Sequence, residues 1–299
     1  MCRAPDIHPV IYKARMLQRI RRLLDSEGYL EIMTPILRRY PGDADRPRLQ
    51  LSDGRWLRES SVFALRCNLQ HAPAIYELAA CFRPDELDST HLPEFTMLDL
   101  YRQEASLGEM LELACRLVRT FYKGQIETLS FAGHLFEDLG IDLFSDPGAS
   151  EALVRKFRQM YNKPDISPLW LIDRYITEQI EPLSRGRCMV VTDFPLLPEV
   201  RARRRDGQGA IVERFEILID CVEVLHGYTD EDDPERFEAQ ARHLASFGPE
   251  DAIMCDLMRD GSVPPRSAGF GIGIERLCRM ALGLDSVEPL RTSLPFTAP

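Results

Sequence analysis

Two glutamates near a predicted turn are candidates for binding a divalent cation. Glu216 and Glu223 lie seven residues apart and would point to opposite faces of one straight strand. A two-residue turn at 220–221 would instead make a hairpin in which Leu218 lies opposite Glu223. Glu216 would then face Leu225, so that both carboxylates share one face as diagonal neighbours roughly 7 Å apart. Such a pair can hold Mg²⁺ against phosphates, although a solvated acidic hairpin explains the same pattern.

A second group of polar side chains lies in residues 81–101, where two extended runs flank a polar loop. If the second run is a strand, period-two alternation places four side chains on one face: Phe95, Met97, Asp99 and Tyr101. Arg83, on the first run, would meet that face with a guanidinium suited to a phosphate or a carboxylate. A plain antiparallel hairpin with a polar outer face is the alternative explanation of this segment.

Three alternating glycines form the third candidate feature. Gly269, Gly271 and Gly273 are separated by apolar residues, which predicts a strand with one bare and one apolar face. A bare face is needed where a flat ligand or another backbone comes close. The spacing differs from the dinucleotide-binding G-x-G-x-x-G pattern. Arg276 follows where a helix should begin, and its guanidinium can meet an anion there.

Helices and strands must bring these distant residues together. The apolar residues of 11–26 recur at helical spacing, and Gly28 follows where a left-handed cap would end the helix. A capping box that begins at Ser106 predicts a second helix to about Lys123. Several short helical segments at about 135–180 carry no motif and are typical of an insertion.

A run of arginines between Arg201 and Gly209 predicts an exposed loop. The run contains four guanidinium groups ahead of an Asp-Gly pair, at Arg201, Arg203, Arg204 and Arg205. A solvated, mobile loop explains it, and docking of an acceptor molecule is the alternative.

Composition restricts the class of protein. The chain of 299 residues is 44% hydrophobic and 28% charged, and it contains neither a signal-peptide core nor a long apolar stretch. Its eight cysteines show no zinc-type spacing, which favours reduced thiols. Together with the missing apolar stretch, this predicts a cytoplasmic protein without membrane contact. The net charge of −10 disfavours extended binding of nucleic acid, because that affinity comes largely from neutralised phosphates.

The candidate segments, in this order, resemble the motifs of class II aminoacyl-tRNA synthetases. The words Phe82-Arg83, His91-x-Pro93-Glu94-Phe95-Thr96-Met97 and Gly269-x-Gly271-x-Gly273-x-Glu275-Arg276 look like the lysyl branch of the Asp/Asn/Lys subgroup. The segment Gly28 to Pro35 is similar to the first motif, through which members form homodimers. The resemblance implies an α+β fold with an antiparallel β-sheet flanked by helices, and it covers residues 1–299 as one catalytic domain.

The resemblance also implies three sets of site residues. ATP would be bound by Arg83, Asp85, His91, Phe95, Gly271, Gly273 and Arg276. The substrate amino acid would contact Val62, Asp99, Tyr101, His226, Tyr228, Asp230 and Gly271. Glu216 and Glu223 would bind Mg²⁺. Among these, Arg83 would contact the substrate carboxylate and the α-phosphate, Phe95 would stack on adenine, and Arg276 would hold the terminal phosphate. Arg83 and Arg276 are therefore the expected catalytic residues.

Several positions depart from the family pattern. Members usually bind the substrate α-ammonium with a glutamate, and Val62 is aligned there; Glu59 could replace it only if the loop differed. Asp99 and Asp230 stand where two glutamates grip the lysine side chain, and each is one methylene shorter. His226 and Tyr228 replace an asparagine and a phenylalanine of the wall. We expect a cationic substrate that is longer or differently branched than lysine, or one whose amine is displaced or masked.

These features predict an ATP-dependent ligase that forms an aminoacyl-adenylate and transfers the acyl group to a non-tRNA acceptor. The first-motif helix starts near residue 11, which leaves no room for the anticodon-binding barrel of lysyl-tRNA synthetases. The chain thereby resembles the truncated lysyl-type ligases that modify a lysine of elongation factor P, although Gly271 replaces their usual alanine. The alternatives are tRNA aminoacylation without an anticodon domain, and a non-catalytic ATP-binding regulator.

Overall fold

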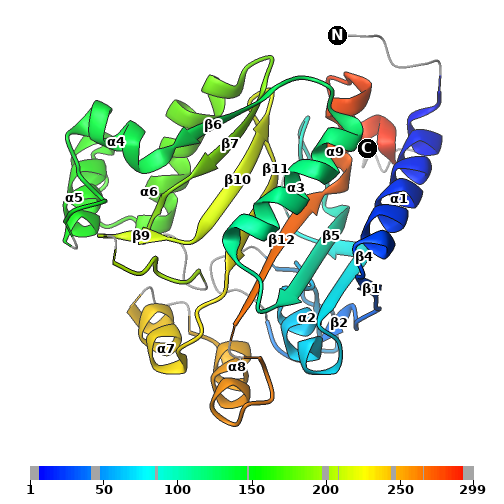
Figure 1. The fold of residues 1–299 in the computed structure, drawn as a ribbon, viewed down its shortest axis with the longest axis horizontal. Helices are drawn as coiled ribbons and strands as arrows, with labels where there is room; N and C mark the ends of the chain where they lie inside the picture. Colours follow the sequence, from blue (N-terminus) through cyan, green and yellow to red (C-terminus); the bar gives the residue numbers. More distant parts are fainter. Residues whose placement is uncertain are drawn as a thin grey trace.

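An eight-stranded mixed sheet forms the centre of the molecule (Figure 1). The computed structural model describes residues 7–41, 48–84, 87–146, 148–196, 202–207, 209–243, 247–264 and 266–291. In spatial order the strands are β1 (Leu30–Glu31), β4 (Ala74–Phe82), β5 (Glu94–Gln103), β12 (Ser267–Gly273), β11 (Val222–Thr229), β10 (Arg214–Ile219), β7 (Cys188–Thr192) and β6 (Ile126–Ser130). The inner six strands are antiparallel, as predicted, whereas the edge strands β1 and β6 pair in parallel with their neighbours.

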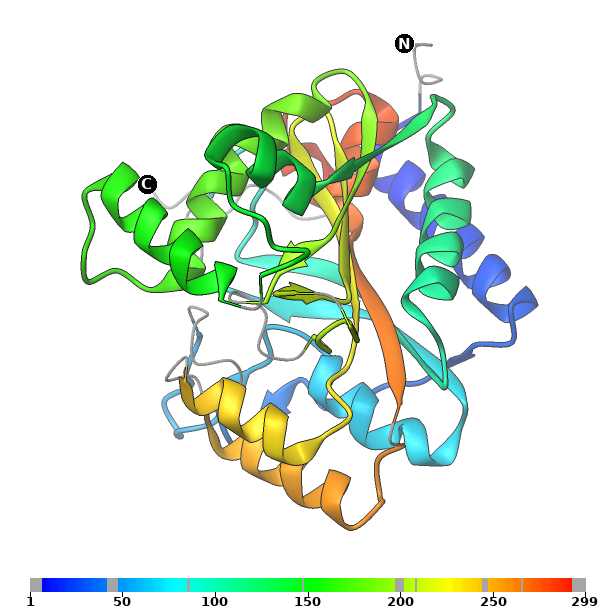
Figure 2. The same cartoon turned by 60° about the vertical axis from the view of Figure 1, so that its left-hand side comes forward.

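Three helices cover one face of the sheet: α1 (Pro9–Ser26), α3 (Leu107–Phe121) and α9 (Ile274–Leu282). Figure 2 shows α1 and α3 side by side, joined by an ion pair of 2.8 Å between Glu27 and Arg116. Their buried side chains meet every second residue of the central strands, such as Leu98 and Ile272. The α+β class with helices flanking a sheet is therefore confirmed.

Local sequence signals set the ends of these helices. Helix α1 begins two residues before the predicted start, because Pro9 occupies the first turn and the His8 side chain accepts from the amide of Val10 at 3.4 Å. Gly28 follows it with φ of +80°, a conformation that glycine adopts without strain. The capping box at Ser106 and Glu109 is present at the start of α3.

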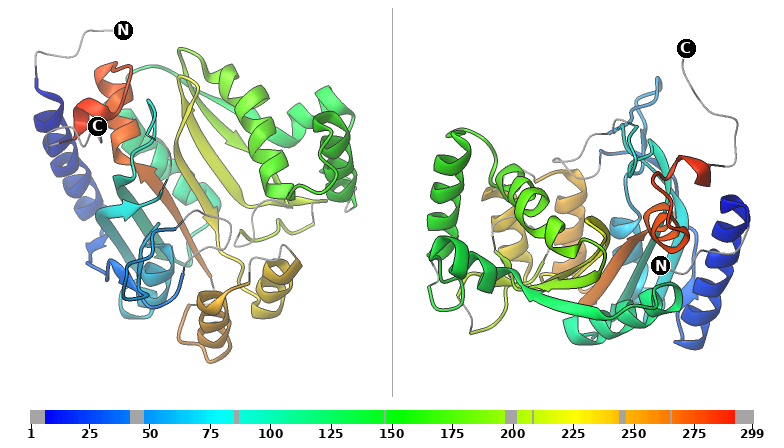
Figure 3. Two further views of the ribbon diagram at one scale, coloured as in Figure 1. Left: turned by 180° about the vertical axis from the view of Figure 1, so that it is seen from behind. Right: turned by 90° about the horizontal axis from the view of Figure 1, so that it is seen from above.

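A helical segment packs against the opposite face at the β6 end of the sheet (Figure 3). It contains α4 (Phe131–Leu139), α5 (Ala149–Tyr161) and α6 (Pro168–Tyr175), then a π-turn (Ile176–Ile180) and a 3₁₀ turn (Glu181–Ser184). Strand β7 divides its side chains between the two cores: Val190 points to the α1 and α3 side, whereas Met189 and Val191 point to these helices. Among the described residues, no helix combines the length and apolar character needed to cross a membrane.

Shorter elements surround the remaining part of that face. They are α2 (Val62–Asn68) with a 3₁₀ turn (Leu69–His71), α7 (Pro234–His243), α8 (Pro249–Arg259), the pair β2 (Leu37–Arg38) and β3 (Trp56–Leu57), and the pair β8 (Phe194–Pro195) and β9 (Ile211–Val212). A further 3₁₀ turn (Glu288–Leu290) instead packs beside α1 and α9 on the other face. Helices α7 and α8 lie side by side below the sheet in Figure 1 and share a small apolar core.

The prediction of an exposed arginine loop is confirmed only in part for the described residues of 201–209, since Arg204, Asp206 and Gly207 are exposed but Ala202 and Arg203 are buried. Ala202 is fully buried and pairs with Asp230 through a β-bridge. Arg203 is 9% exposed, because it forms ion pairs with Asp206 at 2.6 Å and with Asp232 at 3.6 Å. Arg204 donates to the carbonyl of Gly209, and Arg205 pairs with Asp193 at 2.7 Å. These guanidinium groups therefore stabilise the segment itself; Arg201 lies outside the described residues.

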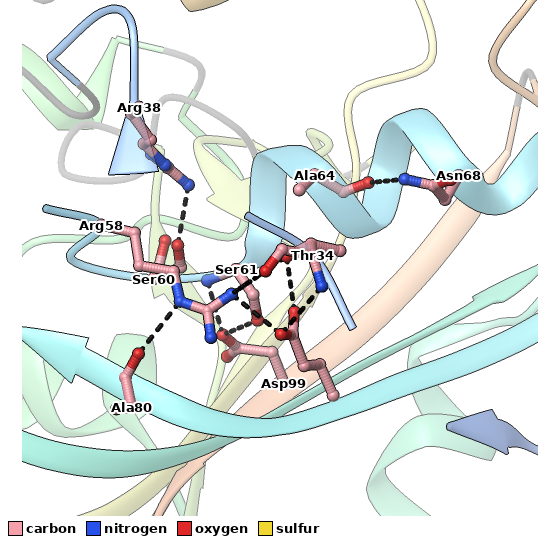
Figure 4. Close-up of polar contacts among 10 residues, drawn as sticks. Thr34, Arg38, Arg58, Ser60, Ser61, Ala64, Asn68, Ala80 and Asp99 are labelled. Carbon is pink, nitrogen blue, oxygen red and sulfur yellow. Dashed lines mark hydrogen bonds and ion pairs between the residues drawn. The ribbon is translucent and has the colours of Figure 1, made fainter. Parts of the chain in front are cut away.

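A buried arginine ties the segment after β1 to the strand beside it (Figure 4). Arg58 is 1% exposed and donates to Glu77 at 2.9 Å, to the hydroxyl of Thr34 at 3.0 Å and to the carbonyl of Ala80 at 3.0 Å. Glu77 in turn accepts from the amide and the hydroxyl of Thr34. This network fixes the loop that leads to α2 against β4.

We expect the substitution Arg58→Met to lower the free energy of unfolding by about 3–5 kcal/mol, because it leaves the Glu77 carboxylate buried without its counter-ion. Urea unfolding followed by circular dichroism measures the change. Arg55→Met removes an exposed arginine paired with Asp53 and is the matched control, whose unfolding midpoint should not change. Equal midpoints for the two variants would contradict the proposed importance of the buried pair.

Candidate active site

A lane of bare backbone runs along β12 on the face opposite α1 and α3. We call Gly269, Gly271 and Gly273 the glycine lane. A methyl group at Gly269 would lie 2.2 Å from the carbonyl oxygen of Leu100, and one at Gly271 would lie 2.7 Å from Oδ1 of Asp99. A side chain at Gly269 would therefore collide with the backbone, and one at Gly271 would displace the Asp99 carboxylate, which leans over the lane. At Gly273 a methyl group would make ordinary contacts with Arg276, the nearest atom being 3.5 Å away. The predicted bare face of this strand is confirmed.

One row of residues crosses the sheet at Gly271. Neighbouring strands place these residues directly opposite one another, in the order Glu77, Asp99, Gly271, His226 and Glu216. Directly opposite residues of antiparallel strands point to the same face. The row therefore brings together three predicted substrate-binding residues and one predicted metal-binding residue on the glycine lane.

The next row is built from aromatic side chains. Tyr101 and Tyr228 flank Gly269, and the hydroxyl of Tyr101 donates to that of Tyr228 at 3.2 Å. Burial, with the nearby Tyr228 and Asp230, raises the pKa of Tyr101 well above its ordinary value, so it stays a neutral phenol. The ring of His226 lies parallel to that of Tyr228, with centroids 6.4 Å apart. His226 and Tyr228 thus line the lane on the β11 side, and Tyr101 lines it on the β5 side.

The acidic hairpin forms as predicted at its turn but not along its length. Asp220 and Cys221 both have positive φ, as a two-residue hairpin turn requires, and Leu218 lies opposite Glu223. The predicted pairing of Glu216 with Leu225 is wrong. A β-bulge between 217 and 218 shifts the register, so that Glu216 faces His226 instead. Because the bulge adds one residue on β11, the two glutamates still share the lane face.

Burial and neighbouring charges shift the pKa values of the two hairpin glutamates in opposite directions. Burial and the charge of Glu223 raise the pKa of Glu216 to about 7, against the effect of its ion pair with Arg214. Burial would raise the pKa of Glu223, but two neighbouring cationic side chains hold it below the usual range. They are His226, whose Nδ1 is 3.1 Å from the carboxylate, and Arg276. Burial and Glu223 also raise the pKa of Glu181, in the 3₁₀ turn, to about 7. A cation at this point would relieve repulsion among the three carboxylates.

The two hairpin glutamates are the residues that would hold a magnesium ion together with phosphate oxygens, and Glu216 would then share its carboxylate between the ion and Arg214. Mg²⁺ is usually held by one or two carboxylates, waters and substrate phosphates. The described residues contain no group of three or more His, Cys, Asp or Glu side chains arranged to hold a metal by themselves. Glu216 and Glu223 would therefore supply two ligands, and the substrate and water would supply the others.

Arg276 is held in place by the loop between β4 and β5. It donates to Nε2 of His91 at 2.8 Å and to the carbonyl of Glu223 at 2.9 Å. His91 must accept there, so its proton lies on Nδ1, which is 2.9 Å from Oδ2 of Asp88. Burial would raise the pKa of Asp88, but hydrogen bonds from the amide of Thr90 and from His91 lower it to about 2. Two predicted ATP-binding residues are thus joined before any ligand enters.

Arg83 lies on the ring that is expected to carry the nucleotide base. Its guanidinium carbon is 5.0 Å from the centroid of Phe95, and Nη2 donates to the carbonyl of Glu59 at 3.4 Å. Both side chains are half-buried at the end of the β4–β5 hairpin. Asp85, another predicted ATP-binding residue, lies outside the described residues.

The start of α2 meets Asp99. The amide and the hydroxyl of Ser61 donate to Oδ2 of Asp99 at 3.0 and 2.7 Å (Figure 4). Val62 is the first residue of α2 and packs against the apolar cluster of Leu65, Leu69, Ile75 and Tyr101, so an apolar side chain occupies the position aligned with the family glutamate. Glu59 forms an ion pair of 3.1 Å with Arg38.

Sequence reasoning missed Arg66, which pairs with the second predicted ammonium-binding acid. Arg66 Nε lies 3.2 Å from Oδ2 of Asp230, and both side chains are at most 3% exposed. The hydroxyl of Ser267 also donates to this carboxylate. A single charged residue among the apolar side chains of a short helix was the available signal, but it gave no indication of a partner 164 residues away.

Comparison with known proteins agrees with these motifs. The sequence profile described as "tRNA synthetases class II (D, K and N)" matches residues 3–293. The lysine–tRNA ligase of Roseiflexus sp. (strain RS-1) is 29% identical over 318 residues, which cover 95% of this chain and 64% of the relative. That of Helicobacter pylori (strain Shi470) is 27% identical, with 95% and 63% covered. A probable cytoplasmic lysine–tRNA ligase of Encephalitozoon cuniculi is 27% identical, with 89% and 61% covered. The chain thus spans less than two thirds of these relatives.

Proposed function

Because the chain belongs to the class II tRNA synthetases of the Asp, Lys and Asn group, we propose that it is an ATP-dependent ligase. It activates the carboxylate of a lysine-like, cationic amino acid as an aminoacyl-adenylate and transfers the acyl group to an acceptor amine. The glycine lane supports this proposal best. It offers a flat ligand a backbone surface, with Phe95 and Arg83 at one end and Asp99 beside Gly271.

The proposed reaction is in-line attack of the substrate carboxylate on the α-phosphate, with pyrophosphate leaving. Arg83 would hold the carboxylate and the α-phosphate, and Arg276 would hold the terminal phosphate through its planar donors. Mg²⁺, bound by Glu216 and Glu223, would supply positive charge to the phosphates. The protein would thus act by positioning and electrostatic stabilisation, without a nucleophile of its own.

We propose an acceptor other than tRNA, such as a lysine of elongation factor P, in the cytoplasm. The net charge of −10 and the ion pairs of Arg203 with Asp206 and of Arg205 with Asp193 support it, since both reduce the positive charge that tRNA binding would need. The names of the relatives favour tRNA as the alternative acceptor. A non-catalytic regulator is the third candidate, favoured by the apolar Val62 in place of a glutamate.

Calorimetric titration with ATP and Mg²⁺, followed by acid-dependent ATP–pyrophosphate exchange, tests the proposal. We expect nucleotide binding and exchange with at least one amine-bearing acid. Binding without exchange over a broad panel of acids would favour the regulator. Transfer of radiolabelled acid to purified tRNA, compared with transfer to elongation factor P, separates the two acceptors.

We propose a homodimer formed through Gly28–Pro35. Met33 is 93% exposed and Leu30 57% exposed, and both lie at the β1 edge of the sheet beside the exposed Ile36 and Leu37. An apolar patch on an open sheet edge is typical of a protein interface.

The double substitution Leu30→Asp and Met33→Asp should convert the dimer to a monomer, because it places charges in an apolar interface. Sedimentation equilibrium measures the change, and we expect the dissociation constant to rise at least 100-fold. Met160→Asp alters an exposed methionine of α5 that is 45% exposed, and serves as the control. A wild-type monomer at micromolar concentration would contradict the proposal.

A further inference from the structure

We infer that the substrate carries a single ammonium group, bound by Asp99, at the end of the chain remote from its carboxylate. The inference rests on the proposed function and narrows its substrate class. An acid with one distal amine, or a diamino acid whose α-amine is acylated, meets the requirement. Lysine itself, with two free ammonium groups, does not.

Six carboxylates in this part of the molecule are at most 3% exposed, and four of them already have a cationic partner. Glu59 pairs with Arg38 at 3.1 Å, Glu77 with Arg58 at 2.9 Å, Asp230 with Arg66 at 3.2 Å, and Glu216 with Arg214. Glu231 accepts from the backbone amides of Asp232 and Asp233 and lies outside the row of residues that crosses the glycine lane. Asp99 is 1% exposed and accepts hydrogen bonds from Ser61 alone, a neutral donor, among the described residues. A buried carboxylate without a counter-ion is unfavourable, so Asp99 is the acid of this row that a ligand cation would stabilise.

The position of Asp99 agrees with this role. Its Oδ2 is occupied by Ser61, whereas its Oδ1 lies over Gly271, 2.7 Å from where a methyl group there would be. The second oxygen therefore faces the glycine lane, where the proposed substrate lies.

Arg66 removes the second contact that a side-chain ammonium would otherwise make. Its guanidinium occupies the positive position beside Asp230, and it also donates to the carbonyl of Glu231 at 3.3 Å. Ser267 donates to the same carboxylate. An ammonium brought between Arg66 and Asp230 would meet a like charge at close range in a buried site, which is strongly unfavourable.

Around Val62, the described residues offer the α-ammonium no unpaired acid either. Val62 packs against the apolar cluster that includes Ile75 and Tyr101, and Glu59, the acid three residues before it, is paired with Arg38. An α-amino acid bound here would leave its α-ammonium partly desolvated beside an apolar side chain. A substrate without that charge avoids the loss.

The loop that leads into α2 contacts both groups proposed to bind the ends of the substrate. Arg83 Nη2 donates to the carbonyl of Glu59 at 3.4 Å, and the amide of Ser61 donates to Oδ2 of Asp99 at 3.0 Å. The guanidinium proposed to bind the carboxylate and the carboxylate proposed to bind the ammonium are therefore held two residues apart on one loop. A short flexible acid with a distal amine, such as 6-aminohexanoate, is a suitable probe of both.

Calorimetry of the full chain with Mg²⁺ and a non-hydrolysable ATP analogue tests the inference without requiring catalysis. The titrants are 6-aminohexanoate, Nα-acetyl-lysine, lysine, norleucine and hexanoate. We expect the first two to bind at least 30-fold more tightly than lysine, and norleucine and hexanoate to bind more weakly than 6-aminohexanoate. Lysine binding within threefold of 6-aminohexanoate, or binding of none of these acids, would overturn the inference.

The substitution Asp99→Asn gives a second test, since asparagine can keep the hydrogen bonds to Ser61. We expect at least a 30-fold loss of 6-aminohexanoate binding and no change for hexanoate. Glu104→Gln, at an exposed residue just after β5, is the control. Unchanged 6-aminohexanoate binding by a folded Asp99→Asn variant would refute the role of Asp99. Failure of pyrophosphate exchange with every acid would count against the proposed function, and the binding ratios would still decide this inference.

Discussion

Replacing Arg83 by alanine should lower kcat/KM for acid-dependent ATP–pyrophosphate exchange by about 10³-fold, the upper range for loss of one preorganised donor in an active site. The expectation follows from the position of its guanidinium at the end of the glycine lane, on the ring of Phe95. The planar group can donate to the carboxylate and the phosphate at once, which an ammonium group cannot reproduce. Arg83→Lys should therefore recover little of the lost rate.

Pyrophosphate exchange with radiolabelled pyrophosphate measures the effect of the Arg83 variants. Arg102→Ala removes an exposed arginine from the same hairpin, on β5, and should leave the rate unchanged. Circular dichroism confirms that each variant is folded. If Arg83→Ala retained more than a tenth of the wild-type kcat/KM, the guanidinium would have no catalytic role.

Replacing Glu223 by glutamine should lower kcat/KM for ATP by about 10²-fold at millimolar Mg²⁺, in the range known for altered metal sites. The neutral amide is a weaker magnesium ligand than a carboxylate. It also leaves Glu216 as the one remaining charged ligand of the pair. The Mg²⁺ concentration for half-maximal activity should rise at least tenfold, so that excess Mg²⁺ recovers part of the rate.

A magnesium titration of the exchange rate separates loss of metal binding from loss of structure. Glu127→Gln is the matched control, since Glu127, on β6, forms a partly exposed ion pair with Arg187. A Glu223→Gln variant with an unchanged magnesium dependence would show that the hairpin glutamates do not bind the ion.

In the proposed reaction, Arg276 would meet the terminal phosphate from a position that the protein already fixes. It is already held by His91 and by the carbonyl of Glu223, and Asp88 fixes the tautomer of His91. Preorganised donors of this kind stabilise developing charge without a cost of reorganisation during the reaction.

The sequence by itself determined the local features of this protein. The helix that ends before Gly28, the capping box at Ser106, the turn at 220–221 and the glycine lane are all present where the sequence predicted them. Each depends on interactions within a few residues, or on the alternation of side chains along one strand. The motif order also indicated the family before any contact was known.

Tertiary structure alone decided which charges are available to a ligand. Two ion pairs, Arg66 with Asp230 and Arg38 with Glu59, join residues that are distant in the sequence. Arg203 is buried although its sequence context predicts exposure. The bulge that moves Glu216 opposite His226 likewise became visible only in the strand pairing, since alternation along the sequence gives no sign of an extra residue. Periodicity predicts the face on which a side chain lies, but the counter-ion that it meets depends on how distant segments pack together. Of the two predicted ammonium-binding acids, Asp99 therefore accepts hydrogen bonds from a neutral donor, Ser61, whereas Asp230 pairs with Arg66.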